Sequence, residues 1–393
     1  MPDALKLVQD DFSSDEELKK AIDKACDLME EIYTSGRYPE MIVERSWSKH
    51  NPVIDGELAQ PKAYRWYLKR EIKRLLGYGA KITIKPSREI LPLNNPALFD
   101  NVDEDDWDIT QKKLFLFRAE RIDISLDRLQ HYTGTNAADF QRYILFTNYD
   151  MHVEVFLDKY PGSVKPNRTV QMPAYHHKLD NNSGVTLINI GVGPSNAKTI
   201  TDHVGVLRPD AMIMVGHCGG LRNHQDIGDF VLANGYMRAD KVLDDLFPVG
   251  VPVSPNYILN RYLKEVLDRH ELNHRIGTVY TTANRNWEFS KVRTQQEIHQ
   301  SRSVAIDMES STVATNGFRY RIPHATLLCV SDKPLHGKPK LSDDVQSFYQ
   351  NSKEMHLELV IEALKMVKQT YPEGLPNSSI RAFNEPLMGG SDS

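Results

Sequence analysis

The sequence predicts a mixed, mainly parallel α/β sheet flanked by helices, preceded by a smaller α+β domain. From about Thr135 onward, short apolar strands alternate with turns and helical segments, which is the order typical of a parallel sheet. Before that point the order differs, because helical segments come first and strand-like segments follow. We therefore expect an N-terminal α+β domain over residues 1–134 and a second domain over residues 135–393.

In the first part, Ser14 and Glu17 form a capping-box pattern at the start of a helix over residues 13–33. A second helix is expected over residues 64–76, before Gly77. The remaining segments are predicted as a strand at 81–85, a loop rich in Pro, Asn and Asp at 86–108, and strands at 114–117 and 121–126.

In the second part, apolar runs predict six strands, at residues 143–146, 185–190, 211–215, 230–233, 278–281 and 325–330. Helical patterns predict three helices, at residues 197–207, 312–321 and 344–368. The alternation of these segments is the basis for the predicted sheet.

Composition excludes several classes of protein. The chain has 393 residues and a formal net charge of −5, whereas a dedicated nucleic-acid binder is normally basic. No apolar run approaches the ~20 residues needed to span a bilayer, and the acidic N-terminus lacks the apolar segment of a secretory signal. Three scattered cysteines, Cys26, Cys218 and Cys329, favour a reduced, cytoplasmic protein without disulfides or a zinc site.

A glycine turn follows the strand at 185–190. Gly191 and Gly193 let the backbone turn sharply, and the helix that follows Ser195 and Asn196 presents its positive end to a phosphate or a ribose hydroxyl. The segment is not a dinucleotide-binding fingerprint, because Asn196 occupies the position of the third glycine. A purely structural turn is an equally good explanation.

A second glycine segment, residues 216–220, lies at the end of the strand at 211–215, where open α/β sheets bind ligands. Gly219 and Gly220 leave room for a flat ring against the backbone. The alternative is a tight turn between strand and loop. Cys218 is expected to be a packed small residue, and His217 lacks a partner at metal-ligand spacing, so it is not expected to ligate a metal.

The segment Asp307-Met308-Glu309-Ser310 suits a ribose. An ionised glutamate has only acceptors and can bind two neighbouring hydroxyls, while Met308 offers an apolar surface to the sugar. The alternative is that both residues only stabilise a helix, with Asp307 as its N-cap and Glu309 interacting favourably with the helix dipole.

Asp332 follows an apolar strand directly, in the segment Ser331-Asp332-Lys333. A half-buried carboxyl at this position has a raised pKa and can donate a proton near neutral pH. The alternative is a turn aspartate in an ion pair with Lys333.

The segment 284–288 follows another strand and combines Arg285, Asn286 and Trp287, a cation, an amide and an aromatic surface. These groups suit a purine ring and an anion. The alternative is a loop that enters a helix, with Trp287 in the core.

In their order along one sheet, these segments resemble the purine nucleoside phosphorylase type I superfamily, and within it the AMP nucleosidases. The resemblance is carried by GVGPSNA at 191–197, GHCGGL at 216–221, RNWE at 285–288, DMES at 307–310 and CVSDKP at 329–334. It covers about residues 125–386 closely and the first part only loosely. It implies a nucleoside-phosphorylase-like fold for the second domain.

The resemblance also implies a reaction, in which AMP and water give adenine and ribose 5-phosphate. By match to the family segments, Asp332 would protonate the leaving adenine at N7, and Glu309 would hold the 2′- and 3′-hydroxyls with Met308 under the sugar. The other substrate-binding positions that it implies are Gly193, Ser195, Asn196, Gly219, Gly220, Arg285, Trp287, Ser331 and Lys333. The sequence does not select a partner for the 5′-phosphate among Arg142, His176, His177, Arg285, Lys333 and Lys338.

The resemblance further implies a homo-oligomer, typically a hexamer built from dimers, and a chemistry that needs no metal or redox cofactor. It also implies MgATP as an allosteric activator, with residues 1–134 as the candidate regulatory domain. Two alternatives remain open: a phosphorylase that uses phosphate instead of water, and a nucleotide sensor without catalysis. The presence of both Glu309 and Asp332 argues against the sensor.

Overall fold

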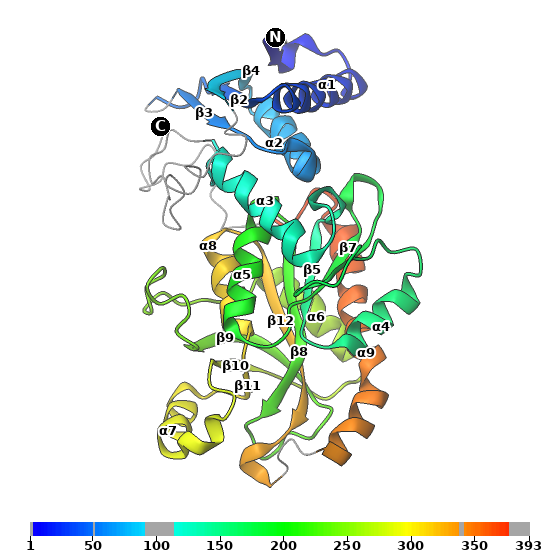
Figure 1. Ribbon diagram of the computed structural model, residues 1–393, viewed down its shortest axis with the longest axis vertical. Helices are drawn as coiled ribbons and strands as arrows, with labels where there is room; N and C mark the ends of the chain where they lie inside the picture. Colours follow the sequence, from blue (N-terminus) through cyan, green and yellow to red (C-terminus); the bar gives the residue numbers. More distant parts are fainter. Residues whose placement is uncertain (1–2, 50–51, 91–113, 338–341, 377–393) are drawn as a thin grey trace. The chain divides into compact units, whose positions relative to one another are not determined.

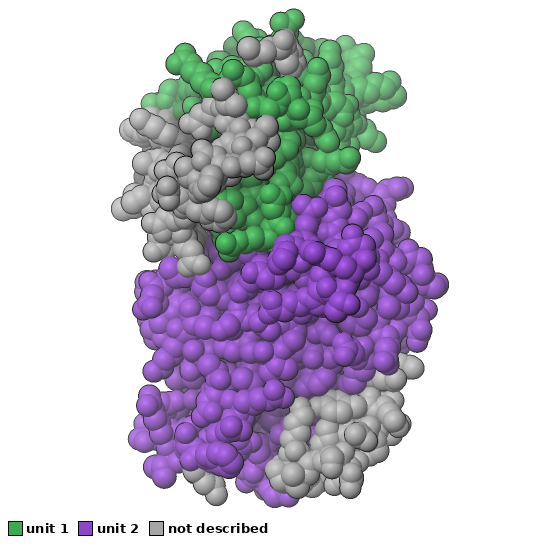
Figure 2. Space-filling model, in the orientation of Figure 1, with its two compact units in different colours: residues 1–128, 206–208, 379–393 green, residues 129–205, 209–378 purple. Residues whose placement is uncertain are grey.

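A computed structural model describes residues 3–49, 52–90, 114–337 and 342–376. The chain forms two compact units, coloured separately in Figure 2. Unit 1 consists of Met1–Arg128, Val206–Arg208 and Ser379–Ser393, and unit 2 consists of Leu129–Gly205 and Pro209–Ser378. None of the helices in the described ranges combines the length and the apolar character that a membrane-spanning helix needs.

Unit 1 contains a four-stranded antiparallel sheet in the order β1-β4-β2-β3, with helices α1 and α2. The strands are β1 (Leu5–Val8), β2 (Arg37–Glu44), β3 (Val53–Glu57) and β4 (Lys81–Ile90), and the helices are α1 (Asp15–Thr34) and α2 (Arg65–Gly77). Both predicted helices are confirmed. The Ser14 Oγ accepts a hydrogen bond from the Glu17 N–H, as the capping pattern requires.

Three predictions in unit 1 are wrong in whole or in part. Residues 121–126 are not a strand but part of helix α3 (Ala119–Thr133), because Ile122, Leu126 and Leu129 form one buried face at helical spacing. Residues 114–117 form an irregular bend rather than a strand. The predicted loop at 86–108 is also wrong at its start, since β4 continues to Ile90. The rest of that loop lies outside the described residues.

Unit 2 is built on an eight-stranded mixed sheet in the order β11-β10-β9-β12-β8-β5-β7-β6. Its strands are β5 (Tyr143–Thr147), β6 (Ala174–His177), β7 (Val185–Asn189), β8 (Ala211–Gly220), β9 (Phe230–Ala239), β10 (His274–Thr282), β11 (Ala305–Asp307) and β12 (His324–Asp332). The pairs β5–β7, β5–β8, β8–β12, β9–β10 and β10–β11 are parallel. The pairs β6–β7, β9–β12 and β8–β11 are antiparallel. All six predicted strands are present, and the sheet is mixed and mainly parallel as predicted.

The pairing of β11 with β8 closes part of this sheet into a ring. β8 pairs with β12, β12 with β9, β9 with β10, β10 with β11, and β11 returns to β8. In this ring Gly219 of β8 pairs with Asp332 at the carboxyl end of β12 and with Ile306 of β11. Strand β11 runs antiparallel to β8 and leads on to Glu309.

Helices cover the sheet in two groups (Figure 1). Helices α4 (Asp150–Lys159), α6 (Tyr257–Arg269) and α9 (Ser342–Thr370) contribute side chains to one large hydrophobic core with the strands. Helices α5 (Pro194–Val204) and α8 (Ser310–Arg319) pack against each other, and α7 (Lys291–Ser301) follows β10. The three helices predicted in this part are confirmed as α5, α8 and α9.

Candidate active site

Glu309 lies between the end of β11 and the start of α8, and its side chain is buried. The Gly193 N–H donates a hydrogen bond of 2.7 Å to Glu309 Oε1, and Asn148 Nδ2 donates one of 3.2 Å to Oε2. Burial, and secondly the charge of nearby Asp307, raise the pKa of Glu309 to about 8. Three chain segments that follow strands β5, β7 and β11 thus converge on one carboxyl group.

The capping of helix α8 is performed by Asp307, not by Glu309. Asp307 Oδ2 accepts a hydrogen bond of 2.9 Å from the Ser310 N–H, and Oδ1 accepts one of 2.6 Å from Thr281 Oγ1. Glu309 makes no side-chain cap hydrogen bond with the helix. The helix-cap explanation therefore holds for Asp307, while the Glu309 carboxyl group is directed to Gly193 and Asn148.

The glycine turn after β7 supplies one of these donors. Gly193 has φ = 116°, a conformation that residues with a side chain rarely adopt, and Pro194 occupies the first turn of α5. Asn196 Nδ2 donates to the Ile190 carbonyl at 3.0 Å and so braces the turn. Ser195 is exposed at the N-terminus of α5. The turn therefore places Gly193 against Glu309 and leaves the Ser195 hydroxyl accessible.

Asp332 is the last residue of β12 and is nearly buried, with 9% of its surface exposed. Ser331 Oγ donates to Asp332 Oδ1 at 2.6 Å. The Lys333 ammonium group donates to the Asn223 carbonyl at 2.9 Å. Ser331 and Lys333, predicted as substrate-binding residues, thus flank Asp332 and anchor the polar end of β12.

Gly219 and Gly220 belong to strand β8, so the alternative of a tight turn at this segment is wrong. A Cβ atom at Gly219 would lie 3.0 Å from Ile306 Cγ2 and 3.6 Å from Asp332 Oδ2. A Cβ atom at Gly220 would lie 2.9 Å from Val330 Cγ1. A side chain would press on Ile306 at Gly219 and would displace Val330 at Gly220, and Gly219 lies beside the Asp332 carboxyl group.

Trp287 lies in a small hydrophobic cluster with Leu221, Tyr280, Ile298 and Ile306. The cluster borders Gly219 through Ile306, so the indole supports the wall of the site. Arg285 is exposed, and its guanidinium group makes no hydrogen bond or ion pair with the described residues. Met308 is half-buried next to Glu309.

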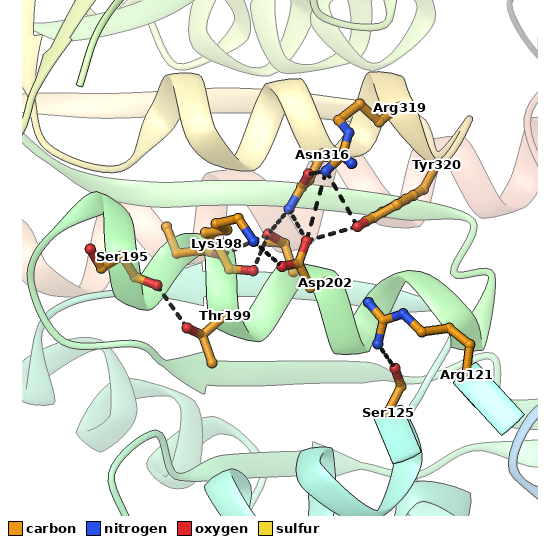
Figure 3. A network of polar contacts seen from close by, with 11 residues as sticks. Arg121, Ser125, Ser195, Lys198, Thr199, Asp202, Asn316, Arg319 and Tyr320 are labelled. Atoms are coloured by element: carbon orange, nitrogen blue, oxygen red, sulfur yellow. Dashed lines mark hydrogen bonds and ion pairs between the residues drawn. The ribbon is translucent and has the colours of Figure 1, made fainter. Parts of the chain in front are cut away.

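The α5–α8 pair is held by a buried polar network centred on Asp202 (Figure 3). Asp202 Oδ1 accepts hydrogen bonds from Asn316 Nδ2 at 2.8 Å and from the Tyr320 hydroxyl at 2.7 Å. Lys198 Nζ donates to Asp202 Oδ2 at 2.8 Å. Because Gly193 precedes α5 and Glu309 precedes α8, this network fixes the two helices whose N-terminal ends form the Gly193–Glu309 contact.

Asn148 was not predicted as a site residue. It follows β5 directly, and the rule that carboxyl ends of parallel strands carry ligand-binding groups would have selected it.

The position of each residue along its strand also distinguishes among the residues predicted as candidates for binding the 5′-phosphate. Arg142 precedes β5 and forms an ion pair with Asp210, and His176 pairs with Thr186 near the start of β7. Both therefore lie at the opposite ends of their strands from the site, and Lys338 is outside the described residues.

Comparison with known proteins identifies the family. Residues 142–365 match the Phosphorylase superfamily. The AMP nucleosidase of Escherichia coli (strain K12) is 38% identical, with 84% of this chain and 82% of that protein covered. The crystal structure of AMP nucleosidase from Bacteroides thetaiotaomicron VPI-5482 has 32% identity and a TM-score of 0.54, covering 64% of this chain and 99% of that chain.

More distant similarities support the fold alone. The structure of purine nucleoside phosphorylase from Toxoplasma gondii has 16% identity and a TM-score of 0.54, covering 62% of this chain and 97% of that chain. The predicted nucleoside-phosphorylase-like fold is thus confirmed. With a relative of 38% identity over most of its length, the chain belongs to the AMP nucleosidase family of the phosphorylase superfamily.

Proposed function

We propose that the protein hydrolyses the N-glycosidic bond of AMP to give adenine and ribose 5-phosphate. Membership of the AMP nucleosidase family supports this substrate. The structural observation that carries the proposal is that Gly219 of β8 pairs both with Asp332, at the end of β12, and with Ile306 of the strand that leads to buried Glu309. Gly219 lies beside Asp332 and pairs with Ile306, three residues before Glu309, so no side chain of β8 fills the space at this point.

Asp332 is proposed as the general acid. Adenine leaves poorly as an anion, and a proton delivered to N7 lets it leave as a neutral base when the C1′–N9 bond breaks. Ser331 Oγ donates a hydrogen bond to Asp332 Oδ1. The other oxygen, Oδ2, faces Gly219, and this is the side on which the base would lie. Water then adds hydroxide to C1′ and releases a proton, which restores the acid. General acid catalysis of this kind contributes ~10²–10⁴-fold to the rate.

Glu309 is proposed to bind the ribose. The Gly193 and Asn148 donors fix its carboxyl group, and the free lone pairs can accept from the 2′- and 3′-hydroxyls. Met308 would lie under the sugar, and Gly219 and Gly220 against the base. A larger set of residues is proposed to border the substrate: Ser195 and Asn196 at the turn before α5, Arg285 and Trp287 after β10, and Ser331 and Lys333 around Asp332.

One assay tests the reaction. The full chain is incubated with AMP and, separately, with adenosine, in the presence and absence of phosphate, and the sugar product is identified. Ribose 5-phosphate formed from AMP without phosphate is the expected result. Ribose 1-phosphate formed only with phosphate would instead show a phosphorylase, and tight AMP binding without adenine release would show a nucleotide sensor.

Assembly and regulation are proposed from the family resemblance. The chain would form a homohexamer, its chemistry would need no cofactor, and MgATP would activate it through the N-terminal unit. Light scattering of the purified protein tests the hexamer. The ratio kcat/KM for AMP, measured with and without MgATP, tests the activation; equal values would contradict a regulatory role for the N-terminal unit.

A further inference from the structure

Three buried histidines lie close together in unit 2. None of them is among the residues proposed to bind AMP. They come from three elements: His152 from α4, His217 from β8 and His356 from α9. Each offers one ring nitrogen, and these nitrogens all lie within 4.8 Å of one another. We call this group the histidine cluster. It brings together residues that are far apart in the sequence, so local ligand spacing could not reveal it.

The ring positions fit a shared ion. The ring centroids are separated by 5.2 Å for His152 and His356, 5.5 Å for His152 and His217, and 5.8 Å for His217 and His356. With Zn–N bonds of ~2.0–2.1 Å and ring centroids ~1.1 Å further out, three imidazoles on a tetrahedral ion have centroids about 5.2 Å apart. The observed separations are close to that value and slightly larger, so a small inward movement of the rings would complete the geometry.

The hydrogen bonds of two rings point to the same conclusion. His152 Nδ1 contacts Thr147 Oγ1 at 2.7 Å, and His356 Nε2 contacts the Leu327 carbonyl at 2.9 Å. The other nitrogens, His152 Nε2 and His356 Nδ1, are buried and have no hydrogen-bond partner among the described residues. Such an atom is costly to bury, and a histidine that ligates a metal typically donates its other ring N–H to a carbonyl or a similar group, as His356 does.

We propose that His152, His217 and His356 bind one divalent transition-metal ion, of the class that prefers imidazole ligands, such as Zn²⁺. Three imidazoles leave one position of a tetrahedral ion, which water takes in sites of this composition. This departs from the expectation of a protein without a metal site, which considered only residues close in the sequence. The proposal is independent of the reaction proposed above.

The ion would connect strands β5 and β8, whose ends lead to residues of the proposed active site. His217 lies on β8, two residues before Gly219. His152 is bonded to Thr147, the residue before the Glu309 partner Asn148. A bound metal would therefore tie the ends of β5 and β8 to helices α4 and α9, which gives it a stabilising role.

Metal content is the direct test. The full chain, prepared without a polyhistidine tag, is treated with a chelator, given Zn²⁺, dialysed and analysed for metal. About one Zn²⁺ per chain should remain, and the melting temperature should rise on Zn²⁺ addition. Co²⁺ in place of Zn²⁺ should give the visible absorption of a four-coordinate nitrogen site. A wild-type protein that retains no ion and shows no Co²⁺ spectrum would overturn the proposal.

Variants locate the ion. His152→Gln and His356→Gln should each lower the Zn²⁺ retained per chain at least tenfold. The matched control is His324→Gln, because His324 is also buried and also contacts a backbone carbonyl, that of Ile322, but lies outside the histidine cluster. Equal Zn²⁺ retention in the cluster variants and the control would place the ion elsewhere and contradict the site. If a cluster variant does not fold, the Co²⁺ spectrum of the wild type decides.

Discussion

The backbone N–H of Gly193 donates a 2.7 Å hydrogen bond to the carboxyl group of Glu309. The two residues are far apart in the sequence and meet because α5 and α8 begin side by side. The contact makes the glycine turn a partner of the proposed ribose-binding residue. A role of the turn in binding the ligand itself stays a prediction.

Replacing Glu309 by Ala should lower kcat/KM for AMP by about 10- to 100-fold, because each of the two hydrogen bonds to the ribose hydroxyls contributes ~0.5–1.5 kcal/mol. The measurement is steady-state release of adenine. Glu271→Ala, at an exposed glutamate outside the segments assigned to the site, is the control and should leave kcat/KM unchanged. An unaltered kcat/KM in the Glu309 variant would remove this residue from the site.

The raised pKa of Glu309 predicts a pH dependence of stability. An ordinary glutamate ionises near 4.5, whereas buried Glu309 does so at about 8, so between these values the folded state binds more protons than the unfolded state. The contribution of this group is complete below pH 4.5 and is lost as the pH rises through 8. The free energy of unfolding of the wild type, relative to Glu309→Gln, should therefore fall by up to ~1.4 kcal/mol per pH unit in this window. Denaturation at several pH values measures it, and a constant difference would contradict the buried, raised state.

Asp332→Asn should lower kcat by ~10²–10⁴-fold and leave AMP affinity largely intact, because the amide keeps the shape but cannot donate the acidic proton. Single-turnover kinetics and equilibrium binding separate the two quantities. Asp245→Asn, an exposed aspartate in the same unit, should behave like the wild type. Near-normal turnover in the Asp332 variant would exclude this residue as the acid.

Gly219→Ala tests the wall of the site. The added Cβ would lie 3.0 Å from Ile306 Cγ2 and 3.6 Å from Asp332 Oδ2, so it would fill the space proposed for the base and press on β11. KM for AMP should rise at least tenfold. Gly235→Ala in β9 is the control, because its Cβ would meet only Thr278 Oγ1, at an ordinary 3.8 Å. Equal KM values in the two variants would show that the base does not lie against Gly219.

The sequence predicted those parts of the fold that local patterns determine. The six apolar runs of unit 2 became strands, since uninterrupted apolar residues are buried on both faces of the sheet. Strand β11 has three residues, too few to produce a pattern, although it closes the ring. Helix α3 was mistaken for a strand because Ile122 and Ile124 are β-branched, whereas the buried face at helical spacing decides the structure.

For the site residues as well, local patterns revealed some positions and missed those that depend on tertiary contacts. Asp332 and the two glycine segments stand next to predicted strands, so their position in the sequence selected them, whereas Glu309 was selected by its segment Asp307-Met308-Glu309-Ser310 and by the family resemblance. Position in the sequence did not reveal Asn148, which is 161 residues away from its partner Glu309. It also did not reveal the histidine cluster, which assembles from three distant elements. Tertiary contacts of this kind depend on strand order, which local patterns do not determine.

Tyr320→Phe tests whether the Asp202 network holds α5 and α8 in place. The variant removes one hydroxyl that donates to a buried carboxyl group at 2.7 Å and leaves the ring, so the free energy of unfolding should fall by ~1.5–3 kcal/mol. Chemical denaturation measures the change. Tyr257→Phe is the control, because that ring is exposed and its loss of a hydroxyl should have no effect. Because the network lies behind the Gly193–Glu309 contact, kcat/KM for AMP should also fall in Tyr320→Phe. A stability loss with unchanged kcat/KM would show that the network supports the fold without positioning Glu309.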